Sequence, residues 1–304
     1  MDTTTKGLLY GMAGIAAFSI TLPATKFAIA ELDPTLVGLG RAGLAAIAAA
    51  ILLLLTRQSI PSRRHFGSLL VVVFGVIIGF PWLSSQALRE LPASHSAVFV
   101  GVLPLLTTLV GMVRAGERPS NAFWLMSVLG SVLVIFFAVV SGANETHKAD
   151  LIMLLAVVFA AFGYAEGARL ARIIGGWQVI SWALLLSVPF LLLPLFEAVV
   201  QYGAKASLTA WLSFIYLGLV SQLLAFFAWY HGLAMAGIAR VSQLQLLQPF
   251  LAIFVSSLWL GEKVSGVTIG FALAVAATVV LGRKMPVGRM DEAKHNPSIV
   301  NRDW

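Results

Sequence analysis

Cysteine is absent from the 304 residues of this chain, and charged residues are scarce. The lack of cysteine excludes disulfide bonds, thiolate metal sites and cysteine nucleophiles. Charged residues make up 11% of the chain, against about 25% in an ordinary soluble domain. The longest internal polar stretches, 57–65, 142–150 and 201–207, are too short to hold a soluble domain. These absences indicate a protein that is embedded in a membrane along most of its length.

Motifs of two common enzyme classes are absent as well. The chain contains no phosphate-binding G-x-x-x-x-G-K-[ST] loop and no H-E-x-x-H pair, which argues against an ATPase and a zinc protease. We find no nucleophile–base cluster and no metal-ligand set inside its apolar segments. We therefore expect no enzymatic activity, no cofactor and no bound metal, and keep a membrane-embedded enzyme only as an unfavoured alternative.

Apolar sequence, in contrast, is abundant: 59% of the residues are apolar and the mean hydropathy is +0.93. A backbone in lipid must satisfy its own hydrogen bonds, and the alternating pattern of β-barrel strands is absent, so we predict an all-α membrane protein. Each predicted transmembrane helix is near the roughly 20 residues that a bilayer core requires. The ten segments are 7–30, 35–56, 67–88, 93–113, 121–141, 151–171, 176–200, 208–230, 240–260 and 264–282.

Positive charge is distributed unevenly between the two sides of this predicted bundle. The net charge of +7 would suggest nucleic-acid binding in a soluble protein. Here fourteen Lys and Arg residues fall on the side of the N-terminus and four on the other side. Because basic loops are retained in the cytoplasm, we expect both termini to be cytoplasmic and expect no nucleic-acid partner.

One motif occurs twice. Pro104 precedes Gly116-Glu117-Arg118, and Pro249 precedes Gly261-Glu262-Lys263, so that the copies lie 145 residues apart. Five predicted helices separate the copies, and an odd number places them on opposite sides of the membrane. The pattern predicts a 5+5 inverted repeat, which is typical of secondary transporters. We expect the first repeat at 1–147, the second at 148–284, and a disordered cytoplasmic tail at 285–304.

In their order and spacing these motifs resemble the drug/metabolite transporter superfamily, and specifically its ten-helix EamA-type members. The resemblance covers nearly all of residues 7–284. The family's opening pattern is present at 23–26, 32–34 and 40–42, although its usual tryptophan-containing start is replaced by Ser-Ile-Thr-Leu at 19–22. The fourth predicted helix resembles the family's at 94–97 and Pro104, and the ninth at 237–242 and Pro249.

The resemblance implies transport of small metabolites by a 5+5 bundle without ATP hydrolysis. Amino-acid exporters have the most similar layout, so we expect amino-acid export across a bacterial inner membrane, by alternating access through a central cavity. The expected partners are a small-molecule substrate and the lipid bilayer. Drugs, nucleotide sugars and other metabolites stay open as substrates. Nucleotide sugars are less favoured, because only Lys26 and Arg41 lie deep within helices and phosphate groups require several convergent cations.

The third predicted helix contains the first two candidate substrate-binding residues. Trp82 and Gln86 share one of its faces, beyond Pro81, which weakens the helix and frees a carbonyl. An aromatic ring beside an amide suits a small organic zwitterion in a cavity. The alternative is a tryptophan in the interfacial belt of the membrane.

Four further candidates lie in the second half of the chain. Gln245 and Gln248 share a face of the ninth predicted helix, where buried amides are costly unless they contact water or one another. Tyr164 lies beside small residues in the sixth helix, and Tyr230 lies near the end of the eighth. Hydrogen bonds between helices and close helix packing are the alternative explanations.

Lys26 and Arg41 are cations inside apolar runs, where a charge is costly. Both are predicted within about two turns of the outer end of their helices, so their long side chains can snorkel to the interface. We expect them to have a structural or gating role rather than to contact the substrate. The resemblance agrees, because the family has basic residues at both positions.

Glu166 is the one carboxylate predicted well inside a helix. It could take up a proton and couple transport to a proton gradient, or pair with Arg169 three residues along the same face; we favour the structural pair. His95 begins the fourth predicted helix and is a candidate cap or gate. Bends for gating are expected at the helix prolines Pro23, Pro81, Pro104 and Pro249.

Overall fold

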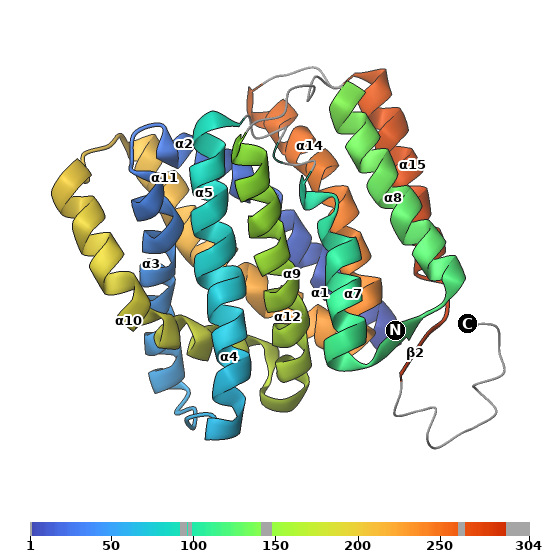
Figure 1. The fold of residues 1–304 in the computed structure, drawn as a ribbon, viewed down its shortest axis with the longest axis horizontal. Helices are drawn as coiled ribbons and strands as arrows, with labels where there is room; N and C mark the ends of the chain where they lie inside the picture. The colour runs from blue at the N-terminus through green and yellow to red at the C-terminus, as the bar shows by residue number, and fades with distance from the viewer. Residues whose placement is uncertain (1, 92–95, 97–98, 141–147, 261–264, 290–304) are drawn as a thin grey trace.

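The apolar segments form helices that lie roughly alongside one another in a single bundle (Figure 1). This computed structural model describes residues 2–91, 96, 99–140, 148–260 and 265–289. The elements up to residue 140 are α1 (Thr3–Phe18), α2 (Thr21–Ile29), α3 (Pro34–Leu55), η1 (Arg63–His65), α4 (Phe66–Val72), η2 (Val73–Gly79), α5 (Phe80–Glu90), α7 (Leu103–Ala115), β1 (Glu117–Pro119) and α8 (Asn121–Val140).

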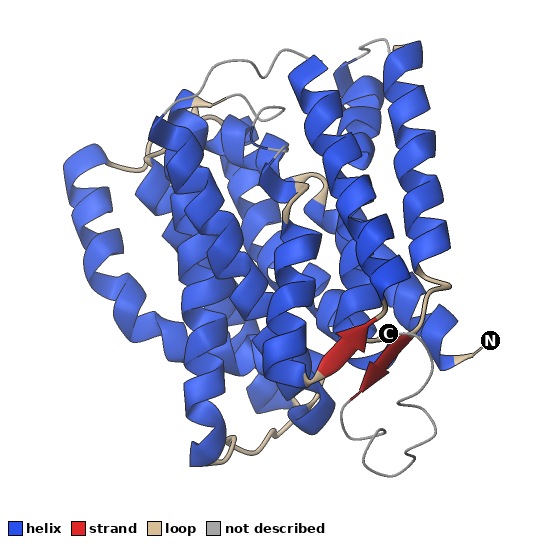
Figure 2. Cartoon of the chain, turned by 45° about the vertical axis from the view of Figure 1, so that its right-hand side comes forward, coloured by secondary structure: helices blue, strands red, loops and turns tan. Residues whose placement is uncertain are grey.

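The remaining elements follow from residue 148. They are α9 (Lys148–Ile174), α10 (Gly176–Tyr202), α11 (Leu208–Ile215), η3 (Tyr216–Leu224), α12 (Ala225–Ala236), α13 (Ile238–Ser242), η4 (Gln243–Leu247), α14 (Gln248–Leu260), α15 (Gly266–Gly282) and β2 (Val287–Arg289). Within the described ranges, the regular secondary structure is therefore helical except for one short pair of strands, which Figure 2 shows at one end.

Six helical runs among the described residues are long and apolar enough to cross a membrane when consecutive elements are joined. They are Thr3–Ile29, Pro34–Leu55, Arg63–Glu90, Lys148–Ile174, Gly176–Tyr202 and Leu208–Ala236. These runs confirm six of the ten predicted segments as membrane-length helices. Shorter apolar helices at Leu103–Ala115, Asn121–Phe137 and Gly266–Gly282 overlap three of the other four predicted segments.

The surface of the bundle is apolar over wide areas. Leu54 and Leu55 are each 77% exposed, and Val113 is 78% exposed. Exposed apolar surface on this scale marks a membrane or protein contact rather than a face in water. The exposure and the long apolar helices together show that the chain is a helical membrane protein, as the composition predicts.

Several of the helical runs are interrupted. At four of these interruptions, the helix that follows has a proline in its first turn. Pro23 lies in the first turn of α2, just after the break at residues 19–20 between α1 and α2. Pro81, Pro104 and Pro249 each occupy the first turn of α5, α7 and α14 in the same way. Proline has no N–H to donate to the carbonyl four residues earlier, so the preceding turn loosens. The regular helix is therefore interrupted at the positions where the sequence predicted bends.

Two of the interruptions are π-helical, η2 and η3. A π-helical turn holds an extra residue and leaves carbonyl groups open to other donors, and such turns are frequent at functional sites. The sequence analysis predicted a bend at Pro81 but no wide turn in either helix.

One end of the bundle, which we call the terminal face, holds the start of α1, the end of α15 and the two strands (Figure 1). The strands pair antiparallel, with Glu117 opposite Arg289 and Pro119 opposite Val287. The prediction of disorder over 285–304 is wrong for residues 287–289, because pairing with β1 satisfies their backbone. Residues 290–304 lie outside the described residues. The opposite face holds the loops at 30–33 and 203–207.

Close helix packing positions the middle of the bundle. A Cβ atom on Gly75 in η2 would lie 2.6 Å from the Cα atom of Gly163 in α9, so the two backbones touch there. Small residues allow this kind of approach between membrane helices. The contact fixes η2 against α9 beside the cavity described next.

Candidate functional site

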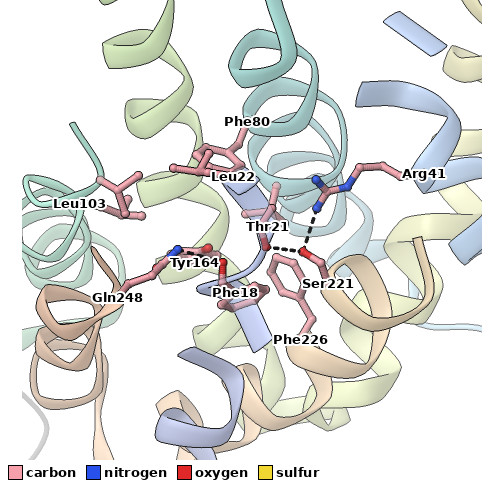
Figure 3. A pocket seen from close by; sticks show the side chains of 12 residues that line it. Phe18, Thr21, Leu22, Arg41, Phe80, Leu103, Tyr164, Ser221, Phe226 and Gln248 are labelled. Atoms are coloured by element: carbon pink, nitrogen blue, oxygen red, sulfur yellow. Dashed lines mark hydrogen bonds between the residues drawn. The ribbon is translucent and has the colours of Figure 1, made fainter. Parts of the chain in front are cut away.

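A small cavity lies in the bundle where elements from the first half of the chain meet elements from the second. Its free volume is about 20 Å³, which is room for about one water molecule. Apolar side chains form most of its wall: Phe18, Leu22, Val76, Phe80, Val100, Leu103 and Phe226. The polar lining residues are Thr21, Arg41, Tyr164, Ser221 and Gln248 (Figure 3).

Arg41 contributes the charge in this cavity. Its residue is 3% exposed, and its Nε donates to Oε1 of Gln222 at 3.0 Å. One terminal nitrogen donates to Oγ of Ser221 at 3.2 Å, and this hydroxyl shares a hydrogen bond of 2.8 Å with Thr21 (Figure 3). The predicted snorkelling of Arg41 is wrong, because the guanidinium is directed inward by these neutral partners.

Gln222 links the two π-helical segments. It lies in η3, is fully buried, and its Nε2 donates to the carbonyl oxygen of Val76 in η2 at 3.0 Å. The open carbonyl of a wide turn is thereby satisfied, while the other end of the same amide accepts from Arg41. The sequence analysis missed Gln222, as well as Ser221 and Thr21. The signal that could have revealed Gln222 is an amide inside a long apolar run.

Aromatic rings surround the part of the cavity formed by α1, α9 and α12. Tyr164 stacks on Phe18 with ring centroids 6.3 Å apart, and Phe18 meets Phe226 edge-on at 5.1 Å. Trp229 closes the cluster at 5.5 Å from Tyr164. Of the predicted tyrosines, the structure brings Tyr164 to the cavity. Tyr230 lies next to it instead, because its hydroxyl donates to the carbonyl of Gly163 at 3.0 Å and ties α12 to α9.

The two predicted glutamines of the ninth helix have different surroundings. Gln248 lines the cavity, and its Nε2 donates to the carbonyl of Phe18 at 3.2 Å. Gln245 is 1% exposed, lies one turn nearer the terminal face, and makes no side-chain hydrogen bond to a described residue. The 3-10 turn of η4 keeps residues three apart on one face, as predicted, but only Gln248 reaches the cavity.

Trp82 and Gln86 do not reach the cavity. Both donate to the hydroxyl of Thr35 on α3, at 3.4 Å and 3.1 Å respectively, and Trp82 is 39% exposed. Phe80 is the α5 residue that lines the cavity. Residues two and six positions further along a helix point away from that face, since each step turns it by about 100°. The prediction that Trp82 and Gln86 line the cavity is therefore wrong.

Lys26 has a position consistent with the structural role expected for it. Its Nζ donates to the carbonyl oxygens of Leu88 at 2.5 Å and Leu91 at 3.1 Å. A cation at these last carbonyls of α5 complements the negative end of the helix dipole. His95, the predicted cap or gate, lies outside the described residues.

Glu166 is a point of attachment between three helices. Its carboxylate accepts from Nε of Arg114 on α7 at 2.9 Å and from a terminal nitrogen of Arg169 at 2.5 Å. Arg169 also donates to Ser68 on α4 at 2.8 Å. The predicted pair with Arg169 is confirmed, and both oxygens are engaged in helix contacts, which favours the structural role.

Glu117 makes a second buried carboxylate contact, at the terminal face. Gly116 ends α7 in the left-handed conformation with φ of 66° and turns the chain so that Glu117 points inward. Its oxygens accept from the backbone N–H groups of Ile238 and Ala239, both at 2.8 Å, and from Arg172 at 2.9 Å. We call this arrangement the Glu117 clasp. It holds the start of α13 against α7 and α9, whereas the second copy of the motif, 261–263, lies outside the described residues.

A possible metal site is not found: within the described ranges, no three His, Asp or Glu side chains gather together. The cavity instead combines one buried cation, hydroxyl and amide groups, and aromatic rings. Such a lining can hold a small amphipathic organic molecule in an orientation fixed by a few polar contacts.

Comparison with known proteins identifies a family. The family described as the EamA-like transporter family matches residues 5–140 and, a second time, residues 147–283. An uncharacterised transporter of Bacillus subtilis strain 168, YdeK, is 44% identical over 284 residues, which cover 93% of this chain and 99% of that protein.

More distant similarities extend this result. A protein of Streptantibioticus cattleyicolor, named a probable terminal-alkyne amino-acid exporter, is 30% identical over 210 residues, covering 67% of this chain and 68% of that protein. A solved crystal structure has the same fold, with a TM-score of 0.74 at 16% identity over 91% of this chain and 97% of that one.

Proposed function

The chain belongs to the EamA-like transporter family, and from that premise we propose that it is a secondary transporter that exports small organic metabolites, with amino acids as its main substrates. A relative at 30% identity is named as a probable amino-acid exporter, which supports this substrate class. The chain would work by alternating access, without ATP and without a cofactor.

We propose that ten transmembrane helices form this transporter as a 5+5 inverted repeat, with the repeats at 1–147 and 148–284. The family matches twice, over 5–140 and 147–283, which supports two copies of one unit. The π-helical segments η2 and η3 add to this, because they begin at nearly the same distance from the start of each matched region. Inverted repeats allow the two halves to exchange inward-open and outward-open shapes.

The observation that carries the proposal is the cavity shared by the two halves. Thr21 and Arg41 reach it from the first half, and Tyr164, Ser221 and Gln248 reach it from the second. A site at the interface of two repeats is where alternating access requires the substrate to bind. A membrane-embedded enzyme would instead need a reactive cluster, and the lining combines none of the usual nucleophile–base pairs.

The cavity volume describes a closed shape of the transporter. Small-molecule sites commonly measure about 300–1,000 Å³, far above the about 20 Å³ found here. Helices must therefore separate before a metabolite enters. The proline-linked interruptions of α1–α2, η2–α5 and η4–α14 border the cavity and supply points where the runs can bend. This supports a gating role for Pro23 and Pro249, and we extend it to Pro104 and His95.

The orientation follows from the distribution of basic residues. We place the transporter in a bacterial inner membrane with the terminal face in the cytoplasm, because Lys and Arg are concentrated on that side. The bacterial relatives are consistent with this location.

Reconstitution in liposomes tests the proposal. Liposomes loaded with a panel of labelled amino acids are assayed for saturable efflux, with and without a pH gradient. We expect Gln248→Leu to lower efflux by about tenfold, as the loss of one hydrogen bond predicts. Gln86→Leu, a matched change outside the cavity, is expected to leave efflux unchanged. Efflux no faster than from protein-free liposomes for every solute would overturn the function.

A further inference from the structure

The charge of the cavity is left without a counterion. The guanidinium of Arg41 contacts the neutral side chains of Gln222 and Ser221, and the ion pairs among the described residues involve Arg114, Arg169 and Arg172 but not Arg41. Burying an unpaired cation is costly, so proteins usually pair it or neutralise it. We propose, on the basis of the proposed function, that Arg41 binds the carboxylate of the substrate and that a substrate amine is not required.

The geometry leaves the guanidinium able to bind a carboxylate. Arginine presents five N–H donors in a planar fork. The hydrogen bonds to Gln222 and Ser221 use Nε and one terminal nitrogen and fix the fork in place, while the other terminal nitrogen makes no hydrogen bond to a described residue and Arg41 lines the cavity. Gln222 is itself anchored to Val76, and Ser221 to Thr21. A planar carboxylate matches such a fork with two parallel hydrogen bonds, which are stronger than bonds between neutral groups.

The lining offers no equivalent partner for an ammonium group. None of the described residues around the cavity is acidic. The neutral oxygens of Tyr164 and Gln248 can accept a hydrogen bond from an amine, but they do not compensate its charge. Because selectivity is a difference between affinities, a cation meeting Arg41 is rejected while an anion is favoured. The site therefore selects carboxylates, and the α-amino group of an amino acid contributes little.

The rest of the lining indicates the shape of the carboxylate. Phe18, Phe80 and Phe226 provide aromatic faces, and Leu22 and Leu103 provide aliphatic ones. Apolar side chains with this arrangement suit an aromatic or branched aliphatic tail. The substrate class is thus an apolar monocarboxylate, amino acid or not.

Thermal unfolding of the purified protein tests this without requiring transport. Tryptophan fluorescence is followed with 3-phenylpropionate, which has the carboxylate alone, and with L-phenylalaninamide, which has the amine alone. L-Phenylalanine is the reference. We expect both carboxylates to raise the unfolding temperature to a similar extent, and the amide to leave it unchanged.

Variants of Arg41 identify the residue responsible. Arg41→Gln is expected to bind 3-phenylpropionate about tenfold to a hundredfold more weakly, and Arg41→Lys to recover part of the loss, since it keeps charge but not the fork. Arg64→Gln, which removes an exposed cation at the terminal face, is the matched control and should bind normally.

Three results would overturn the inference: stabilisation by the amide equal to that by 3-phenylpropionate, undiminished binding in Arg41→Gln, or no stabilisation by either carboxylate at millimolar concentration. Failure of efflux in liposomes would instead remove the proposed transport function, and a ligand-dependent shift abolished by Arg41→Gln would still stand.

Discussion

Two regions of this protein treat buried charge in opposite ways. Near the terminal face, the carboxylates of Glu117 and Glu166 are buried, and each is paired with an arginine of another element: Glu117 with Arg172, and Glu166 with Arg114 as well as with Arg169 on its own helix. In the cavity, Arg41 is buried as deeply but has only neutral partners among the described residues. In the first region each buried carboxylate has an oppositely charged partner, and in the second region the buried cation has none among the described residues.

This difference indicates that the paired carboxylates hold the helices together, whereas the unpaired Arg41 is available to bind a ligand. A paired carboxylate that also accepts backbone N–H groups, as in the Glu117 clasp, holds three elements together and has no capacity left for a ligand. An unpaired cation adds little to cohesion, because its desolvation cost is not repaid by a counter-charge within the protein. The comparison therefore predicts that substitutions in the two regions change stability very differently.

The largest loss of stability is expected for Glu117→Ala. The change leaves Arg172 without its counter-charge and the first N–H groups of α13 without acceptors, which should cost about 3 kcal/mol. The midpoint of thermal unfolding in detergent is the measurement. Glu117→Gln, which keeps an acceptor oxygen, should lose less. An unfolding midpoint for Glu117→Ala equal to that of the unaltered protein would show that the clasp does not hold the bundle together.

A much smaller change is expected for Arg41→Met. Removing the buried cation relieves its desolvation cost, which offsets the hydrogen bonds lost to Gln222 and Ser221, so stability should stay within about 1 kcal/mol. The same unfolding assay, without ligand, measures it. A loss as large as that of Glu117→Ala would mean that Arg41 is a structural residue, and the contrast between the two regions would disappear.

The smallest effect concerns an exposed carboxylate on the opposite face. Glu31 accepts from the hydroxyl of Ser207 at 2.6 Å and from its backbone N–H at 2.7 Å, and these bonds lower the pKa of Glu31 below 4.5. Its contribution to stability is therefore fully present above pH 4.5 and is lost as the pH falls through the lower folded-state pKa. We expect unaltered protein and Glu31→Gln to differ slightly at neutral pH and to converge in acid. Unfolding midpoints measured from neutral pH down to acid check this, and a gap that widens in acid would contradict it.

Much of the fold follows from composition and proline placement. Long apolar runs predict the membrane helices, and Pro23, Pro81, Pro104 and Pro249 each lie just after an interruption of a helical run. The wide turns η2 and η3 could not be predicted, because no residue type demands a π-helical turn; contacts such as Gln222 to Val76 stabilise it. The strand at 287–289 was missed for a similar reason, since its partner strand lies far away in sequence: Glu117, opposite Arg289, is 172 residues earlier.

The candidate site was predicted in part. Tyr164 and Gln248 were identified as polar or aromatic side chains in apolar helices, and both line the cavity. Trp82 and Gln86 satisfied the same criterion, but helix periodicity alone does not say which face of α5 is turned inward. Arg41 was given a structural or gating role with a snorkelling side chain, because its depth was judged from sequence position, whereas Gln222 and Ser221 direct it into the bundle.

The wide turn η3 makes the site sensitive to chain length. Deleting one residue between Tyr216 and Leu224 would restore an ordinary helical turn and rotate everything beyond it by about 100° relative to α11. Depending on where the deletion fell, Ser221 and Gln222 would swing away from Arg41, or Phe226 and Trp229 would leave Tyr164. The extra residue of this π-helical turn thus determines how the polar side chains of the cavity are oriented relative to its aromatic side chains.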